Sequence, residues 1–337
     1  MPRGESGDDM SDSFWLDRPV FVTGATGLLG SHMVAHLVRE RANVVCLVRD
    51  SVSQSHFSRL GLADKVSIVR GSLEDYALLE RSLNEYEINT VFHLGAQTIV
   101  SIANRNPLST WESNVRGSYL LLEACRRNPK KLERVVIASS DKAYGAQPKL
   151  PYDEDSPLIG RYPYDCSKSC TDLISTCYHV SYGLPVCITR CGNLFGPGDL
   201  NWNRIIPGTI RSALRCDNPI IRSDGSFVRD YFYVEDAVAS YMGLAAQMNR
   251  DDVVGQAFNF SDEKPMDVIA IAKLILRLMD RDDLQLEVLG NEAPNEIPEQ
   301  YLSSEKARRL LAGWKPRFGI EEGLRRTIAW YTELLAA

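Results

Sequence analysis

The 337-residue chain has no apolar run long enough to span a membrane and no excess of basic residues. A transmembrane helix needs about 20 mostly apolar residues in a row, and no stretch approaches that length. Lysine and arginine number 38 against 44 aspartates and glutamates, which gives a net charge of −6. This balance does not favour nucleic acid or an anionic membrane surface. We therefore expect neither as a partner.

The sequence also lacks the cysteine and histidine spacings of a structural metal site. None of its eight cysteines forms a Cys-x-x-Cys pair, and its five histidines show no matching spacing. Zinc sites depend on such closely spaced ligands, so we expect no metal. Cysteines scattered through apolar patterns are typical of free thiols in a reducing compartment, which predicts a cytoplasmic protein.

Short runs rich in valine, isoleucine and leucine predict six strands, which begin near residues 19, 43, 65, 90, 134 and 184. Amphipathic stretches between them predict helices, among them 74–87 and 110–127. Near-continuous apolar strands that alternate with helices are typical of a parallel sheet covered on both faces. The expected fold class is α/β: a Rossmann-type doubly wound parallel sheet with a smaller α/β C-terminal substrate lobe.

The composition changes after Gly192 and predicts two interleaved domains. Residues 1–17 are polar and acidic without the apolar core of a signal peptide, and we predict a flexible tail there. The first domain, which holds the sheet, is predicted to cover 18–192 and about 231–262, where a further helix and strand return to the sheet. The second, smaller lobe would comprise 193–230 and about 263–337, the latter with two amphipathic helices around a polar loop at 290–300.

Residues 23–30, TGATGLLG, place three glycines between a predicted strand and a predicted helix. Glycines at such a turn let the backbone approach a pyrophosphate, and the helix N-terminus supplies N–H donors for the phosphates. The sequence therefore predicts a dinucleotide site at this turn. The cofactor contacts predicted there are Gly24, Thr26, Gly27, Leu28 and Leu29.

The end of the second strand carries the usual signals for both nicotinamide cofactors. An acidic residue there binds the adenosine ribose of NAD, whereas an arginine accommodates the 2′-phosphate of NADP. Arg49 and Asp50 provide one of each, so we predict NAD and leave NADP open because of Arg49. The remaining cofactor contacts are predicted at Ser72, Leu73, Leu94, Ala96, Tyr164 and Lys168.

Tyr164 and Lys168 form a Tyr-x-x-x-Lys pair, which a helix places one turn apart on one face. A nearby cation favours the phenolate, so such a tyrosine can take a proton from a sugar hydroxyl near neutral pH. Ser140, Asp141 and Lys142 add an acid and an amine directly after a predicted strand. Together these groups predict elimination of water from a sugar in addition to hydride transfer.

The chain resembles the extended short-chain dehydrogenases/reductases that act on nucleotide sugars, over essentially all of residues 18–337. The resemblance lies in TGATGLLG, HLGAQ (93–97), SSDKAYG (139–145), YDCSK (164–168) and RCGNLFGPGD (190–199). Within that family, CDP-glucose 4,6-dehydratases carry Ser-Asp-Lys as this chain does. The dTDP-glucose enzymes carry Thr-Asp-Glu there, and epimerases typically carry small residues. The resemblance therefore implies conversion of CDP-glucose to CDP-4-keto-6-deoxyglucose.

The resemblance also implies a role for each catalytic residue. Tyr164 takes the proton of the 4-hydroxyl while hydride leaves C4 for the nicotinamide; Lys168 lowers the pKa of Tyr164, and Ser140 holds O4. Asp141 protonates the departing 6-hydroxyl, and Lys142 stands where the base that removes the C5 proton is expected. Lysine is a poor base unless it is desolvated or close to another cation. Lys142 could therefore instead orient Asp141 or a water.

Substrate contacts and a dimer are implied in the same way. The resemblance implies a homodimer formed through helix 110–127 and the helix that carries Tyr164. His93 is expected to be a structural histidine, and Asn114 is expected to hydrogen-bond backbone near the active site. The predicted substrate-binding residues are Gln97, Asn193, Arg204, Arg222, Arg229 and Tyr301.

Two other functions stay open. A nucleotide-sugar 4-epimerase or decarboxylase on the same scaffold would use only the oxidation at C4. Asp141 and Lys142 argue against it, because such an enzyme needs no acid at C6. A non-catalytic nucleotide-binding protein is disfavoured by the complete set of Ser140, Tyr164 and Lys168.

Overall fold

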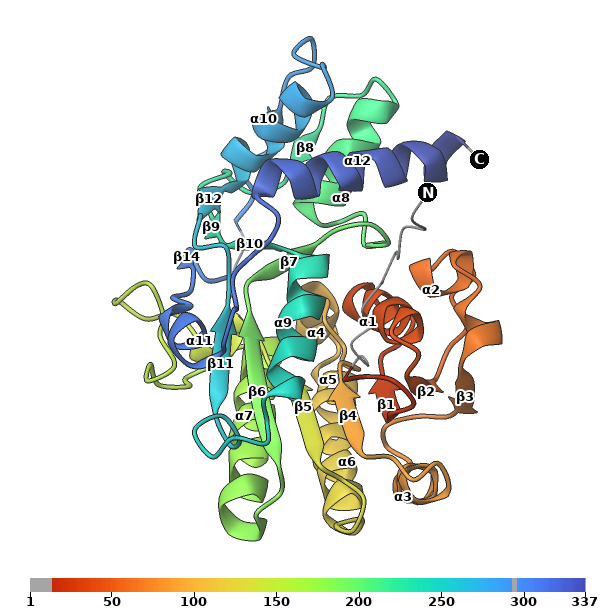
Figure 1. Ribbon diagram of the computed structural model, residues 1–337. Coiled ribbons are helices and arrows are strands. Elements are labelled where there is room, and N and C mark those ends of the chain that lie inside the picture. The colour runs from red at the N-terminus through yellow and green to blue at the C-terminus, as the bar shows by residue number, and fades with distance from the viewer. Residues whose placement is uncertain (1–13, 293–295, 337) are drawn as a thin grey trace, which may run out of the picture.

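A seven-stranded sheet forms the centre of the molecule (Figure 1). The computed structural model describes residues 14–292 and 296–336. All neighbouring strands of this sheet pair in parallel, in the order β11-β6-β5-β4-β1-β2-β3. The strands are β1 (Pro19–Thr23), β2 (Asn43–Val48), β3 (Ser67–Arg70), β4 (Thr90–His93), β5 (Arg134–Ala138), β6 (Val186–Cys191) and β11 (Ala257–Phe260).

Helices cover both faces of this sheet because successive strand residues point to opposite sides. In β1, Val20 and Val22 face one core, which α1 (Leu28–Arg39) and α9 (Val234–Ala246) complete, and Phe21 faces the other. The second core is completed by α3 (Tyr76–Glu85), α6 (Gly117–Arg126) and α7 (Pro163–Tyr182). The predicted α/β fold with a doubly wound parallel sheet is confirmed.

The carboxyl ends of β5, β4 and β1 lie side by side at one edge of the sheet, because these strands are direct neighbours. The strand order changes direction between β1 and β4. Ligands of open α/β sheets bind outside the carboxyl ends of the strands at such a switch point. The Gly-rich turn after β1 and the Ser140 segment after β5 are thereby brought to the same place.

A smaller C-terminal region packs around a third apolar core. Its helices α8 (Ile205–Leu214), α10 (Val268–Leu278) and α12 (Ile320–Ala336) contact one another above the sheet in Figure 1. The two helices expected between 263 and 337 are therefore present, but a short third one, α11 (Glu305–Leu310), lies between them. The predicted domain boundaries stay a prediction.

Short strands join this region together. A parallel pair is formed by β7 (Asn193–Phe195) and β10 (Tyr231–Tyr233). A three-stranded sheet has β9 (Val228–Arg229) between β12 (Met266–Asp267) and β14 (Glu299–Gln300). The remaining elements are β8 (Ile220–Ile221), β13 (Glu287–Val288), α2 (His56–Arg59), α4 (Val100–Arg105), α5 (Pro107–Trp111) and 3₁₀ turns at Leu62–Lys65 and Asp141–Tyr144.

Two boundary predictions are corrected. The tail expected over 1–17 is wrong for its last four residues, because Trp15 is 5% exposed and packs against Phe92 of β4. Residues 1–13 lie outside the described part.

The helix expected over 110–127 consists of α5, a π-helical turn (Glu112–Arg116) and α6. It begins earlier because the Asn106 side chain accepts a hydrogen bond from the backbone N–H of Ser109.

Across residues 14–292 and 296–336, every helix is too short or too polar to cross a membrane.

Candidate active site

The Gly-rich turn between β1 and α1 has the shape of a phosphate cradle. Gly24 has φ +74°, and a Cβ there would lie 2.7 Å from the backbone nitrogen of Gly95 after β4. A Cβ on Gly30 would overlap the carbonyl oxygen of Gly24. The N-cap of α1 is Gly27, which has no side chain to cap the first amides of the helix, and free amides at a helix N-terminus are suited to a pyrophosphate. These features fit the predicted nicotinamide dinucleotide.

A buried hydrogen-bond chain fixes the ends of β1 and β4 relative to each other. The Thr23 hydroxyl lies 2.8 Å from His93 Nδ1 and accepts hydrogen bonds from the backbone N–H groups of Leu94 and Gly95. His93 Nε2 lies 2.9 Å from the Ser118 hydroxyl. Burial, with Lys168 nearby, lowers the pKa of His93 to about 3. Both ring nitrogens have partners, so the prediction of a structural histidine is confirmed.

Asn114 joins the segment after β4 to the helix that carries Tyr164 and Lys168. Its Oδ1 accepts a hydrogen bond of 2.7 Å from the backbone N–H of Gln97, and its Nδ2 donates to the Gln97 carbonyl and to the Ser167 hydroxyl. The expected contact of Asn114 with backbone near the site is confirmed. The Gln97 side chain is held by Ile99 and Thr110, and its role in substrate binding stays a prediction.

The Ser140-Asp141-Lys142 segment forms a 3₁₀ turn directly after β5. The Ser140 hydroxyl accepts a hydrogen bond from the Lys142 N–H at 3.2 Å and donates to Asp141 Oδ1 at 2.9 Å. Asp141 is 2% exposed, and its second carboxyl oxygen has no partner in the described residues. Burial raises the pKa of Asp141, although Lys142 opposes the shift. A carboxyl group that holds its proton can act as a general acid.

Tyr164 and Lys168 lie in the first two turns of α7, which packs against this 3₁₀ turn. Burial raises the pKa of Tyr164 to about 12, with a further contribution from Asp141, whereas Arg204 and Ser140 oppose it. The net shift is therefore upward, and the expected lowering contribution of Lys168 stays a prediction. The Lys168 ammonium donates to the Ala138 carbonyl at 2.7 Å, and burial lowers its own pKa to about 8.

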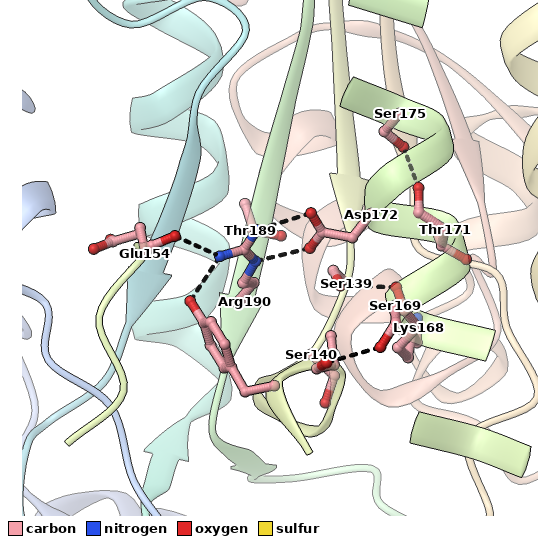
Figure 2. Close-up of polar contacts among 12 residues, drawn as sticks. Ser139, Ser140, Glu154, Lys168, Ser169, Thr171, Asp172, Ser175, Thr189 and Arg190 are labelled. Atoms are coloured by element: carbon pink, nitrogen blue, oxygen red, sulfur yellow. Dashed lines mark hydrogen bonds and ion pairs between the residues drawn. The ribbon is translucent and has the colours of Figure 1, made fainter. Parts of the chain in front are cut away.

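Four residues after Lys168 on α7, Asp172 forms a buried ion pair that connects this helix to β6 (Figure 2). Arg190 Nε lies 2.7 Å from Asp172 Oδ2, and Arg190 Nη2 lies 2.8 Å from Oδ1. Arg190 Nη1 donates to the Tyr144 hydroxyl at 2.7 Å and to the Glu154 carbonyl. Asp172 also opposes the lowering of the Lys168 pKa. The sequence does not reveal this pair, because the two residues stand 18 positions apart on different elements.

The Lys142 ammonium has partners from the C-terminal region. It donates to Glu296 Oε1 at 2.8 Å and to Gln300 Oε1 at 3.4 Å. The same Glu296 oxygen accepts from Arg229 Nη2 at 2.6 Å. Glu296 and Gln300 were not predicted, since no motif identifies them; the predicted Arg229, in contrast, lies within this cluster.

The other predicted arginines lie in partly exposed places. Arg204 pairs with Asp199 at 3.1 Å and acts electrostatically on Tyr164, so the structure brings it near the catalytic residues. Arg222 donates to Asn203 at 2.8 Å.

The other predicted contacts lie at the ends of strands. Asn193 begins β7, and Tyr301 follows β14. Arg49 and Asp50 pair at 2.6 Å after β2, and each side chain is 64% exposed. Their binding roles stay predictions.

Asp230 provides a test of the electrostatics near the site. Burial raises its pKa to about 7, with a contribution from Asp141, while hydrogen bonds from Ser261 and the Leu302 N–H oppose the shift. This value lies above the ordinary 3.8, so the folded protein keeps a proton that the unfolded chain releases. The stabilising contribution is complete below about pH 4 and is lost as the pH rises through about 7.

We therefore expect Asp230→Asn to gain stability relative to the wild type as the pH rises from 4 to 8. The gain would be on the order of 2–4 kcal/mol, because each pKa unit corresponds to about 1.4 kcal/mol. Urea unfolding at several pH values measures it. Asp64→Asn, at an exposed position, is the control and should show no such trend. A constant difference between wild type and Asp230→Asn would contradict the prediction.

The sheet, the Gly-rich cradle and the buried Tyr164–Lys168 pair beside Ser140 are the features of an extended short-chain dehydrogenase/reductase. The model of the GDP-mannose 4,6 dehydratase family matches residues 21–327. The chain belongs to this family.

Two relatives are dehydratases. CDP-glucose 4,6-dehydratase of Salmonella typhimurium is 30% identical over 95% of this chain and 92% of that protein. The trifunctional UDP-glucose 4,6-dehydratase/UDP-4-keto-6-deoxy-D-glucose 3,5-epimerase/UDP-4-keto-L-rhamnose-reductase of Arabidopsis thaliana is 30% identical over 95% of this chain. The chain spans about half the length of the latter, 48%.

Two solved structures show that dehydratases and epimerases share this fold. A UDP-glucose 4-epimerase from Thermotoga maritima, solved with UDP-glucose, has a TM-score of 0.84 and 26% identity, and the match covers 94% of this chain and 99% of that one. A dTDP-glucose 4,6-dehydratase from Streptomyces venezuelae, solved with NAD and TYD bound, has a TM-score of 0.83 and 26% identity, covering 94% and 97%.

Proposed function

We propose that this protein is a nucleotide-sugar 4,6-dehydratase that converts CDP-glucose to CDP-4-keto-6-deoxyglucose. The observation that carries the proposal is Asp141, a buried acid whose Ser140 neighbour lies at the Tyr164 hydroxyl. A 4-epimerase needs only the oxidation at C4, whereas a dehydratase must also protonate the leaving 6-hydroxyl. The sequence relationship to the CDP-glucose enzyme of Salmonella typhimurium supports CDP-glucose as the substrate.

In the proposed mechanism, Tyr164 takes the proton of the 4-hydroxyl, and Ser140 donates a hydrogen bond to O4. NAD, when bound, supplies the hydride acceptor for C4 and afterwards the hydride donor for C6. The C4 carbonyl makes the C5 proton acidic, so a base can remove it. Asp141 then protonates the 6-hydroxyl, which leaves as water. Burial raises the pKa of Asp141 and so favours the protonated form that this step needs.

The residues that would hold the two ligands follow from their positions. The backbone amides after Gly27 and the side chains at the ends of β2 and β4 would bind the dinucleotide, and Lys168 would bind its nicotinamide ribose. Arginine is suited to a diphosphate because its guanidinium binds two oxygens at once. We assign Arg204, Arg222 and Arg229 to the diphosphate of the substrate, with Asn193, Gln97 and Tyr301 as further contacts.

We also propose a homodimer formed through α5, α6 and α7. Six large apolar side chains on these helices are exposed by between 38% and 75%, and α6 packs beside α7. Exposed apolar patches of this kind mark interaction sites. The six residues are Leu108, Trp111, Tyr119, Leu173, Val180 and Tyr182. A cytoplasmic location stays a prediction.

The test is incubation of the purified protein with NAD and, in turn, CDP-glucose, dTDP-glucose, UDP-glucose, UDP-glucuronate and GDP-mannose. Mass spectrometry that detects loss of one water from CDP-glucose would support the proposal, and loss from another sugar would correct the nucleotide. Unchanged mass with inversion at C4, seen by NMR, would instead establish the alternative, a 4-epimerase, which the Thermotoga maritima structure makes the second candidate.

A further inference from the structure

The turn that carries Lys142 is covered by a segment from the other end of the chain. The strand β14 pairs in parallel with β9, which places Gln300 opposite Arg229. The Val228 N–H donates to the Pro298 carbonyl at 3.0 Å and continues this pairing. Glu296, which lies 154 residues from Lys142 in the sequence, is thereby held against its ammonium group.

Glu296 forms charge-assisted hydrogen bonds with two buried cations. Its Oε1 accepts from Lys142 Nζ at 2.8 Å and from Arg229 Nη2 at 2.6 Å. The side chains of Lys142 and Arg229 are 11% and 7% exposed, and that of Glu296 is 24% exposed. Bonds between ionised partners in such surroundings are short and strong. The contact therefore fixes the position of the Lys142 ammonium group.

This arrangement bears on the base that removes the C5 proton. The family resemblance implies that dTDP-type enzymes have a carboxylate at the position of Lys142. An ammonium group that donates to a carboxylate cannot accept a proton until it has lost one. Glu296 Oε1, at 2.8 Å, is an acceptor within reach. The C-terminal segment that carries Glu296 therefore supplies a carboxylate beside position 142, where this chain has a lysine.

We propose that Lys142 and Glu296 act together as the C5 base, with Glu296 taking up the proton that Lys142 gives away. This inference rests on the proposed dehydratase function. As the C5–H bond breaks, its electron pair moves toward the C4 carbonyl, its proton forms an N–H bond on Lys142, and a Lys142 proton passes to Glu296. The C6–O bond then breaks as Asp141 delivers its proton, and water leaves. The pair returns the proton to C5 when C6 receives hydride.

The charged groups around the pair suit this relay. Arg229 is bonded to the accepting oxygen of Glu296, while Asp141 on the 3₁₀ turn and Asp165 on α7 act electrostatically on Lys142 from the other side. Burial would raise the pKa of Glu296, but Lys142 and Arg229 outweigh it and lower this pKa. These two cations favour the carboxylate form of Glu296, which is the form that can accept a proton. Glu296 acts through Lys142 and is a positioning residue, since it contacts no reacting atom.

The test is Glu296→Gln, which keeps the shape of the side chain and removes its charge. Wild type and variant are incubated with NAD and CDP-glucose in deuterium oxide. C4 oxidation is followed by the absorbance of the reduced nicotinamide, and C5 exchange and dehydration by NMR and mass spectrometry. We expect C5 exchange and dehydration to fall about 100-fold or more, while reduced nicotinamide forms at the wild-type rate. Normal C4 oxidation also shows that the variant is folded.

The matched control is Glu299→Gln, an exposed glutamate on the same segment, which should leave both steps unchanged. Glu296→Asp, which keeps the carboxylate, should recover part of the C5 exchange. If Glu296→Gln slows C4 oxidation and C5 exchange equally, or raises only KM, Glu296 merely holds Arg229 for substrate and the relay is overturned. If the wild type itself releases no water from any tested nucleotide sugar, the proposed function fails instead.

Discussion

Tyr164→Phe is expected to lower kcat for nucleotide-sugar turnover by a factor of about 10²–10⁴, the usual contribution of a positioned acid–base group. Tyr164 is 8% exposed at the start of α7, and its ring packs in the same buried surroundings with or without the hydroxyl. The variant should therefore fold normally. Formation of the 4-keto product, followed by its absorbance in alkali, measures the rate, and calorimetry of CDP binding should show unchanged affinity.

The control for this prediction is Tyr162→Phe. Tyr162 precedes α7 by one residue and is only partly buried, so the variant should keep the wild-type rate. A loss in Tyr164→Phe that appears entirely in KM would show that Tyr164 binds substrate without taking its proton. A residual rate near that of the wild type would remove Tyr164 from the mechanism altogether.

Asp172→Asn is expected to lower the free energy of unfolding by about 3–5 kcal/mol, the usual cost of breaking a buried ion pair by removal of one partner. The side chains of Arg190 and Asp172 are 6% and 1% exposed, so the variant leaves the guanidinium of Arg190 buried without its counter-charge (Figure 2). Urea unfolding followed by circular dichroism measures the change.

A surface pair provides the comparison. Glu85→Gln removes the partner of Arg81 on α3, where the two side chains are 53% and 57% exposed, and should cost less than about 1 kcal/mol. The double variant Asp172→Leu with Arg190→Met should recover much of the stability, because it leaves no buried charge unpaired. Equal effects of Asp172→Asn and Glu85→Gln would contradict the prediction.

The loss of the Asp172 carboxylate should also lower the pKa of Lys168. Asp172 opposes the lowering of the Lys168 pKa, and the two residues stand one helical turn apart on α7. Asp172 thus both holds α7 to β6 and opposes the effect of burial on the pKa of Lys168. Neither effect could be seen in the sequence, where Arg190 is one of many basic residues.

Motifs determined the parts of the site that local geometry controls. A tight turn between strand and helix needs glycine at Gly24, where φ is +74°, and a helix places Tyr164 and Lys168 on one face whatever surrounds it. Near-continuous apolar strands that alternate with helices likewise predicted the parallel sheet. The order of its strands brings the carboxyl ends of β1 and β5 together.

Properties that depend on distant neighbours did not follow from the motifs. The pKa of Tyr164 was expected to be lowered by Lys168, but burial and Asp141 raise it. Desolvation is a property of the whole packed structure, and spacing along one helix does not reveal it. Trp15 was assigned to a flexible tail, yet it packs against Phe92. Its neighbours in the sequence do not reveal this contact, because Phe92 lies 77 positions further along the chain.

The sequence by itself determined the class of the protein, since strand periodicity, the Gly-rich turn and the Tyr-x-x-x-Lys pair are local patterns with local physical causes. Only the tertiary structure decided what surrounds Lys142. The pairing of β14 with β9 brings Glu296 to within 2.8 Å of its ammonium group. No local pattern encodes that contact, because chain closure over 154 residues depends on the packing of the entire C-terminal region.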